Sequence, residues 1–247
     1  PLVMQILYPR GIAPLFNEFD PVEAGELRDA VEDVFARAGF ETSDIYTMDA
    51  SRRSSHLNAY FVGFGRTKRV VLFDTLVEKM ALPELQSVLA HELAHWKKAH
   101  IWKQFAASAI QMGLVFAVLG WLVGFEPLYA AFGIPASATY AGLLLAGLIV
   151  GPLVQFTAPL SNKLSLAHER EADDYAAQVM HPEPMIDALG RLAGENLANP
   201  FPHPWYATFH HSHPPIPERI RRLQERADGD AGDEPADGPE DIASGAD

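Results

Sequence analysis

The chain has 247 residues, 48% of them apolar, and a formal net charge of −13 at neutral pH. It contains no cysteine, which excludes disulfides, thiolate metal sites and a cysteine nucleophile. Much of the negative charge lies in residues 227–247, a stretch rich in glycine, proline and acidic residues that predicts a disordered tail. No basic stripe of the kind that binds nucleic acid occurs in the sequence, so we expect no nucleic-acid partner.

The chain begins with an apolar stretch that starts at proline and is too short to span a bilayer. We therefore expect residues 1–20 to be a linker that follows a missing membrane part of a longer chain. Residues 21–103 should then form the first half of a globular domain. Its first helix is predicted to have Asp20 as N-cap and Pro21 in its first turn, and to end at Gly39.

Three short stretches rich in β-branched and aromatic residues follow this helix. The strands are expected at Asp44–Met48, Asn58–Phe61 and Arg69–Phe73. They predict a small antiparallel sheet whose edge could receive an extended peptide as an added strand, although a plain scaffold sheet would have the same sequence pattern.

The central motif lies on the next predicted helix, which begins near Pro83. His91, Glu92 and His95 form a His-Glu-x-x-His pattern, and the two histidines share one face because they are four residues apart. Two such imidazoles can hold one Zn²⁺, and the glutamate can act as general base on water. A histidine pair at this spacing can also be an ordinary surface feature, so the motif needs a third ligand.

The character of the chain changes after the motif, because residues 104–162 contain a single charged residue, Glu126. Two uncharged runs of 21 residues, Phe105–Phe125 and Tyr140–Leu160, are each long enough to cross a bilayer, and Pro152 should kink the second. Lysine and arginine flank this transmembrane hairpin and are missing from its turn. The positive-inside rule therefore predicts that both outer ends face the cytoplasm.

Residues 163–226 should form the second half of the interrupted domain and supply the third ligand. Glu169 and Glu171 both qualify, but Glu169 shares a helix face with Asp173, which could accept a hydrogen bond from a ligating histidine. Glu171 points about 160° away from that pairing and is expected to be exposed. His168 points about 100° from Glu169 and fits less well. Three later histidines, at positions 210, 211 and 213, could form a second metal site or a loop against the first.

Five blocks of sequence, in this order, resemble the zinc-dependent CAAX prenyl proteases, which are integral-membrane gluzincins. The blocks are Ser54–Gly63, Lys68–Leu76, the zinc motif with Trp96, Lys97 and His100, Glu169-x-x-Ala172-Asp173, and Ser212–Pro215 with Glu218 and Arg219. The resemblance runs from about Ile12 to Leu223. It implies a mainly α-helical zincin-type metalloprotease domain with a small antiparallel β-sheet, interrupted by a transmembrane helical hairpin.

The resemblance also implies roles for individual residues. His91, His95 and Glu169 would bind one Zn²⁺, and Glu92 would be the catalytic base. The other implied roles are orientation of a ligand by Asp173, oxyanion stabilisation by His213, and substrate binding by Asn58 and Arg219.

These observations predict a membrane zinc metalloendopeptidase that cleaves peptide or protein substrates, near the C-terminus of prenylated CAAX-type proteins. The alternatives are a quality-control endopeptidase acting on unmodified membrane proteins and a non-catalytic scaffold with structural zinc. The expected site faces the cytoplasm from a bacterial inner membrane, or from the endoplasmic reticulum if the source is eukaryotic.

Overall fold

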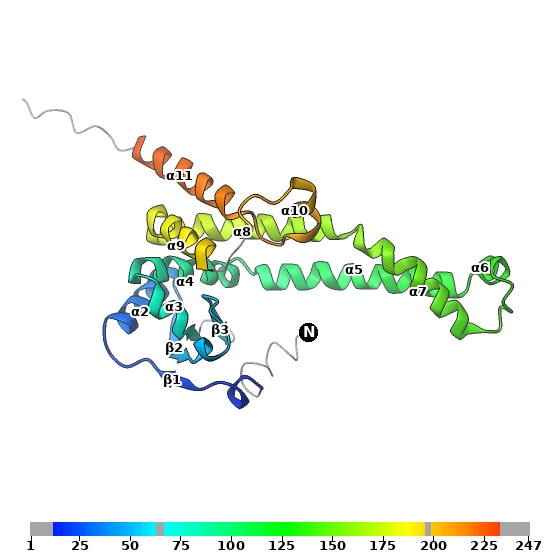
Figure 1. The fold of residues 1–247 in the computed structure, drawn as a ribbon, viewed down its shortest axis with the longest axis horizontal. Helices are drawn as coiled ribbons and strands as arrows, with labels where there is room; N and C mark the ends of the chain where they lie inside the picture. The colour runs from blue at the N-terminus through cyan, green and yellow to red at the C-terminus, as the bar shows by residue number, and fades with distance from the viewer. Residues whose placement is uncertain (1–11, 63–66, 196–198, 233–247) are drawn as a thin grey trace, which may run out of the picture.

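A computed structural model describes residues 12–62, 67–195 and 199–232 of the chain. Figure 1 shows a body of helices and a small sheet from which a long helical hairpin extends. The opening residues, the middle of the predicted connection between the last two strands, and the end of the predicted acidic tail lie outside the described residues. Residues 227–232, where that tail was expected to start, belong instead to the last helix, α11 (Ile216–Gly232).

The sheet has four strands in the order β1-β2-β4-β3. Their bounds are Phe19–Pro21 for β1, Glu41–Met48 for β2, Ala59–Val62 for β3 and Thr67–Phe73 for β4. The prediction of an antiparallel sheet was wrong for the central pair, because β2 and β4 run parallel. The chain passes from β2 to the outer edge, forms β3, and returns antiparallel as β4 between β3 and β2. The sheet is therefore mixed, and β3 is one of its two edges.

The first helix, α2 (Glu26–Ala38), ends at Gly39 as predicted, with that glycine in the left-handed conformation at φ 76°. Its predicted start was wrong. Asp20 and Pro21 form the edge strand β1 and pair with Thr47 and Tyr46 of β2. A proline fits an edge strand because its missing N–H costs no ladder bond there, so the strand pairing prevails over the local helix-start signal.

The metal-motif helix α4 (Leu82–Lys97) crosses the sheet and packs against α2, α8 and α9. A short helix, α3 (Asp74–Lys79), connects it to β4. The core between these elements is formed by aliphatic and aromatic side chains with almost no exposure: Val31, Val34, Phe35, Ile45, Val70, Leu72, Leu76, Leu85, Leu89 and Leu93. Burying one leucine side chain contributes about 1.5–3 kcal/mol, so this core holds α4 firmly against the sheet.

The hairpin consists of α5 (His100–Val123), the short helix α6 (Glu126–Ala131) at its tip and α7 (Thr139–Gln155). Helix α8 (Ala158–Met180) continues α7 back into the body (Figure 1). The expected kink at Pro152 is displaced. Pro152 lies inside α7, and the helix is interrupted one turn later at Phe156 and Thr157, just before α8, which has Pro159 in its first turn.

The C-terminal part of the body consists of three helices that pack on α8, and α9 and α11 also pack on each other. Helix α9 (Pro182–Glu195) contacts α4, α8 and α11, and helix α10 (Pro204–His210) lies against α8. Helix α10 begins at Pro204, a proline in its first turn. This arrangement covers α8 on the side away from the sheet (Figure 1).

Candidate metal centre

Helix α4 holds its two motif histidines from a rigid base. Pro83 stands in its first turn, and the Glu84 carboxylate accepts a hydrogen bond from the Ala81 N–H at 3.0 Å. Arg191 of α9 forms a two-point ion pair with the same carboxylate, at 2.9 and 3.0 Å. The start of the helix is therefore fixed both locally and by a neighbouring helix.

Helix α8 approaches α4 closely because both helices present small residues to the shared core. Ala90 and Ala94 of α4 and Ala172 and Ala176 of α8 are all fully buried. Side chains this small let two helix backbones come near each other. The short carboxyl side chains of α8 can then reach the imidazoles of α4.

Three potential ligand atoms converge between the two helices. The Nε2 atoms of His91 and His95 lie 3.3 Å apart, and each lies 3.5 Å from an oxygen of the Glu169 carboxylate. All three atoms fall within 4.8 Å of one another. Glu171 points away from this cluster, so the geometry favours Glu169 as the third group, as the helical spacing predicted.

The chemistry of the three side chains fits a zinc ion. Two imidazole nitrogens and one carboxylate oxygen form a usual ligand set for catalytic zinc, with a fourth position left open. Glu169 Oε2 is buried, and the Nδ1 atom of His213 lies 2.8 Å from it. A buried carboxylate is costly unless nearby donors or a cation compensate its charge, and a metal ion between the three side chains would do so.

His91 is held from behind by Asp173 and Arg219. Its Nδ1 lies 2.9 Å from Asp173 Oδ1, and Arg219 donates two hydrogen bonds to that carboxylate at 2.6 and 2.8 Å. Burial alone would lower the pKa of His91, but the carboxylates of Asp173 and Glu169 raise it to about 9. An Nδ1 proton shared with Asp173 leaves Nε2 directed at the cluster.

The other two motif residues respond differently to burial. Burial and the neighbouring His91 lower the pKa of His95 to about 4, so its ring is neutral and ready to bind a cation. Burial raises the pKa of Glu92, which interacts with the charges of His91 and Glu169. A carboxylate with a raised pKa is a stronger base, which suits a group that removes a proton.

The remaining predicted residues make varied contacts, and only some of these contacts involve the cluster. His213 contacts Glu169, as stated above, and its side chain is 64% exposed. Asn58 immediately precedes the edge strand β3 and uses its side-chain oxygen to accept the Ala59 N–H at 2.8 Å. Within the described residues, His210 and His211 pack against Tyr206 and are not grouped with other possible metal ligands.

Two residues that the sequence did not single out for this purpose complete the site. His100, the first residue of α5, is buried and places its Nδ1 3.1 Å from Nδ1 of His95. Its Nε2 lies 2.9 Å from the Glu171 carboxylate, whose other oxygen pairs with Lys98 at 3.1 Å. The expected exposure of Glu171 holds in part, since its side chain is 39% exposed, but it contacts a buried group.

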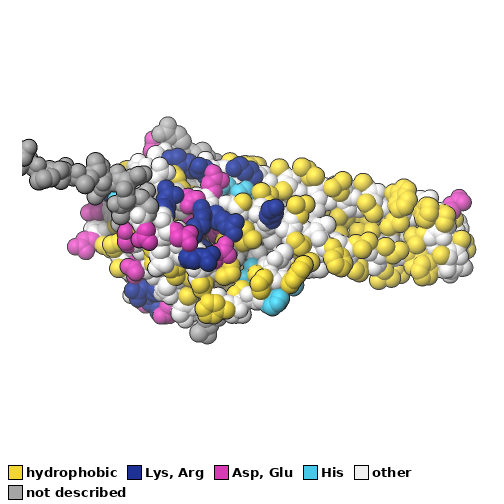
Figure 2. Space-filling model, turned by 90° about the horizontal axis from the view of Figure 1, so that it is seen from above, with side chains coloured by type: hydrophobic (Ala, Val, Ile, Leu, Met, Phe, Trp, Pro, Cys, Tyr) yellow, Lys and Arg dark blue, Asp and Glu magenta, His cyan; other side chains and the backbone are white. Residues whose placement is uncertain are grey.

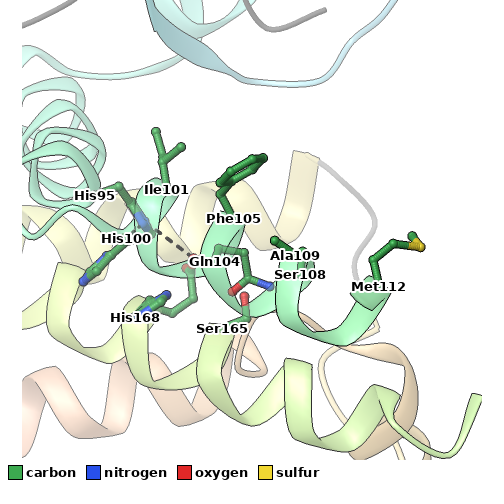
Figure 3. Close-up of a pocket in the computed structure, with 11 residues that line it drawn as sticks. His95, His100, Ile101, Gln104, Phe105, Ser108, Ala109, Met112, Ser165 and His168 are labelled. Atoms are coloured by element: carbon green, nitrogen blue, oxygen red, sulfur yellow. Dashed lines mark hydrogen bonds and ion pairs between the residues drawn. The ribbon is translucent and has the colours of Figure 1, made fainter. Parts of the chain in front are cut away.

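A cavity of about 610 Å³ opens beside the cluster and extends along α5 and α8 (Figure 3). Its inner end is formed by His95, His100, His168 and Glu169, and its outer part by Phe105 and Met112. The cavity therefore joins the polar ligand cluster to the apolar hairpin. A second cavity, of about 620 Å³, lies on the other side of the site and is lined by His213 and Arg219.

A His-Glu-x-x-His helix joined by a glutamate from a later helix defines the gluzincin class of metallopeptidases. The comparison with known families agrees, because the model of peptidase family M48 matches residues 21–227. The chain belongs to this family. The resemblance stated from the sequence blocks is thereby confirmed.

Individual relatives have the same family character. The chain is 37% identical to the CAAX prenyl protease 1 homolog of Oryza sativa subsp. japonica over 91% of its own length and 53% of the relative. It is 35% identical to CAAX prenyl protease 1 of Saccharomyces cerevisiae, over 90% of the chain and 52% of the relative. The crystal structure of S. mikatae Ste24p superposes with a TM-score of 0.79 at 33% identity, over 90% of this chain and 55% of that one. The chain thus spans about half the length of the curated relatives it matches.

The hairpin has the properties of membrane-crossing helices. Two helical segments, His100–Val123 and Thr139–Met180, are long and apolar enough to cross a membrane. Figure 2 shows the extension covered by apolar side chains, whereas charged side chains gather over the body. The large exposed side chains of the hairpin include Ile110, Leu114, Phe116, Trp121, Leu143, Leu144, Leu148 and Leu153. Such exposure does not occur in the core helix of a soluble protein, and with the family relationship it indicates an integral membrane protein.

Proposed function

We propose that this protein is a membrane zinc metalloendopeptidase that cleaves prenylated CAAX-type proteins near their C-terminus. The observation that carries the proposal is the convergence of His91, His95 and Glu169 beside the partly buried base Glu92. A purely structural zinc site would have no use for a base in this position. The prenylated substrate class is suggested by the names of the CAAX prenyl protease relatives.

Each side chain of the metal centre would have a separate role in peptide hydrolysis. A zinc ion bound by the three ligands would supply Lewis acidity at the scissile carbonyl. Glu92 would take a proton from the attacking water and pass it to the leaving amine. His213, exposed at the rim of the site, would donate a hydrogen bond to the developing oxyanion, where loss of one donor typically costs about 10²–10³ in rate.

The substrate would lie between the edge strand and the cavity. Strand β3 is the edge of the sheet next to β4, and it contacts α4, so an extended peptide could pair with it near Asn58. The 610 Å³ cavity provides an apolar surface along Phe105 and Met112 for an isoprenoid. Burying such a chain contributes about 0.8 kcal/mol per CH₂-sized group. Arg219 acts here through Asp173, and it also lines the second cavity, where a substrate could reach it.

The same arrangement supports a cytoplasmic site. Lys97, Lys98 and Lys103 precede the apolar hairpin, Lys163 and Arg170 follow it, and its tip carries only Glu126. By the positive-inside rule the body, with the metal centre, faces the cytoplasm.

The Glu92→Gln variant tests the catalytic assignment. The amide keeps the shape of the side chain but cannot accept a proton, so zinc should stay bound while hydrolysis is lost. Metal content would be measured beside cleavage of a farnesylated CAAX peptide. Full activity of this variant would remove Glu92 from the mechanism, and loss of zinc would assign it a structural role.

The substrate class is tested separately, with matched farnesylated and unfarnesylated peptides. Preference for the farnesylated peptide is expected to appear as a higher kcat/KM, since the isoprenoid adds apolar surface that the cavity can bury. Equal cleavage of both peptides would favour unmodified membrane-protein substrates. This result would reject the prenylated substrate class but leave the assignment of the protein as a peptidase unchanged.

A further inference from the structure

His100 lies between the metal-motif helix α4 and the apolar hairpin. Ala99, between α4 and α5, adopts the left-handed backbone conformation at φ 56°, which is unfavourable for a residue with a Cβ. This turn places the ring of His100, the first residue of α5, next to the ring of His95. The side chain of His100 is almost fully buried, so its two ring nitrogens need partners.

Both nitrogens of His100 have a partner, and together these contacts form a continuous chain. His95 Nδ1 lies 3.1 Å from His100 Nδ1, and His100 Nε2 lies 2.9 Å from Glu171 Oε2. The ring of His168 stacks on His100 with centroids 4.2 Å apart and an interplanar angle of 10°. Figure 3 shows His95, His100 and His168 together at the inner end of the cavity. The stacked ring limits the rotation of His100 without taking part in the hydrogen bonds.

The direction of these hydrogen bonds follows from the chemistry of their ends. The Glu171 carboxylate can only accept, so His100 Nε2 must carry the proton and donate. In a neutral imidazole, His100 Nδ1 is then an acceptor, so His95 must donate from its own Nδ1. This is the tautomer that leaves the lone pair of His95 Nε2 free for a metal.

We propose that His100 and Glu171 are positioning residues that hold His95 in its metal-binding tautomer and orientation. The proposal rests on the proposed zinc site, and it adds a second set of residues that hold a histidine ligand in place. Each histidine ligand would then be backed by a carboxylate, directly by Asp173 for His91 and through His100 for His95. Because His100 begins α5, the proposal also makes the geometry of the metal centre depend on how the apolar hairpin leaves the body.

The decisive variant is His100→Phe, which keeps a flat ring on His168 but removes both nitrogens. Loss of such a supporting hydrogen bond typically weakens metal binding by about 10–100-fold, and that is the expected loss of zinc affinity here. His100→Asn should recover most of the loss, because its amide oxygen can take the place of Nδ1 as acceptor. Zinc affinity would be measured by competition with a chromophoric chelator on the detergent-solubilised protein.

Two further variants separate hydrogen bonding from packing. His168→Phe retains the stack and lies outside the chain of hydrogen bonds, so its zinc affinity should stay within about threefold of the wild type. Glu171→Ala removes the end of the chain and should weaken zinc binding in the same direction as His100→Phe. The visible absorption of the Co²⁺-loaded protein provides a spectroscopic check, because a reoriented His95 changes the ligand field and a packing defect elsewhere does not.

The outcomes separate this proposal from the proposed function. Wild-type affinity and Co²⁺ spectrum in His100→Phe would overturn the positioning role even if the protein cleaves peptides. Weakened binding in both His100→Phe and His168→Phe would also overturn it, in favour of packing. The wild-type protein could instead bind zinc tightly and cleave no peptide. If His100→Phe then weakened zinc binding, the positioning role would stand and the peptidase assignment would be rejected. Thermal unfolding of the metal-free variants shows whether each one is folded.

Discussion

Replacing Asp173 with asparagine should damage the protein far more than replacing its neighbour Asp174. The Asp173 side chain is 3% exposed and accepts two hydrogen bonds from Arg219, whose own side chain is 11% exposed. Asparagine keeps one acceptor oxygen but removes the negative charge, which leaves a buried guanidinium without the carboxylate that it binds. Breaking a buried pair in this way costs about 3–5 kcal/mol of stability.

The same substitution should weaken metal binding, because His91 loses the partner of its Nδ1 at 2.9 Å. We expect a loss of about 10–100-fold in zinc affinity. Asp174→Asn is the matched control. That side chain is 37% exposed and pairs with Arg222 and Arg226 on the surface, where ion pairs contribute about 1 kcal/mol or less.

The assay compares the two variants under the same conditions. Unfolding of each metal-free protein in detergent gives the change in stability, and chelator competition gives zinc affinity. The expected result is a large loss in both measurements for Asp173→Asn and little change for Asp174→Asn. If both variants lost the same amount, burial of the Asp173 pair would not be what stabilises the site, and the reasoning from exposure would fail.

Two further predictions concern protons and topology. Zinc binding at pH 6.5 should release about one proton, because the pKa of His91 in the metal-free protein is raised to about 9, whereas His95, with a pKa lowered to about 4, should release none. Affinity should therefore rise with pH up to about 9, and calorimetry in buffers of different ionisation heat would detect the proton; release of half a proton would indicate an unshifted histidine. In this chain without cysteine, substituted cysteines at Ser137 and Ser55 should be labelled from opposite sides of the membrane. Labelling of both from one side would reject the hairpin topology.

Local sequence signals predicted the elements that carry the site. Pro83 placed the start of the metal helix within a residue of its observed start at Leu82, and Gly39 ended α2 as expected. Helical angles alone separated Glu169 from Glu171, because side chains two positions apart on a helix point about 160° apart. These features depend on residues close together in the chain.

The features that sequence reasoning missed depend on distant residues. Asp20 and Pro21 satisfy a helix-start pattern, yet pairing with β2 turns them into a strand. The parallel β2–β4 pair follows from β4 inserting between β2 and β3, which no local pattern reports. His100 and Glu171 are 71 residues apart and meet only because α8 returns beside the start of α5. A signal existed, since His100 follows the motif closely, but its partner could not be read from the sequence.

The placement of the ligands on the two sides of the hairpin sets an order of events for the growing chain. His91 and His95 are synthesised before α5, and Glu169 after α7, so the carboxylate reaches the histidines only once the hairpin has reversed the chain direction. Closing a loop of this length is entropically unfavourable for a free chain. Once α5 and α7 lie antiparallel, the two ends of the loop are close together, so most of the entropic cost of closing it has already been met. Membrane integration would thus precede assembly of the candidate metal centre, and a nascent chain whose hairpin has not integrated would lack its third side chain.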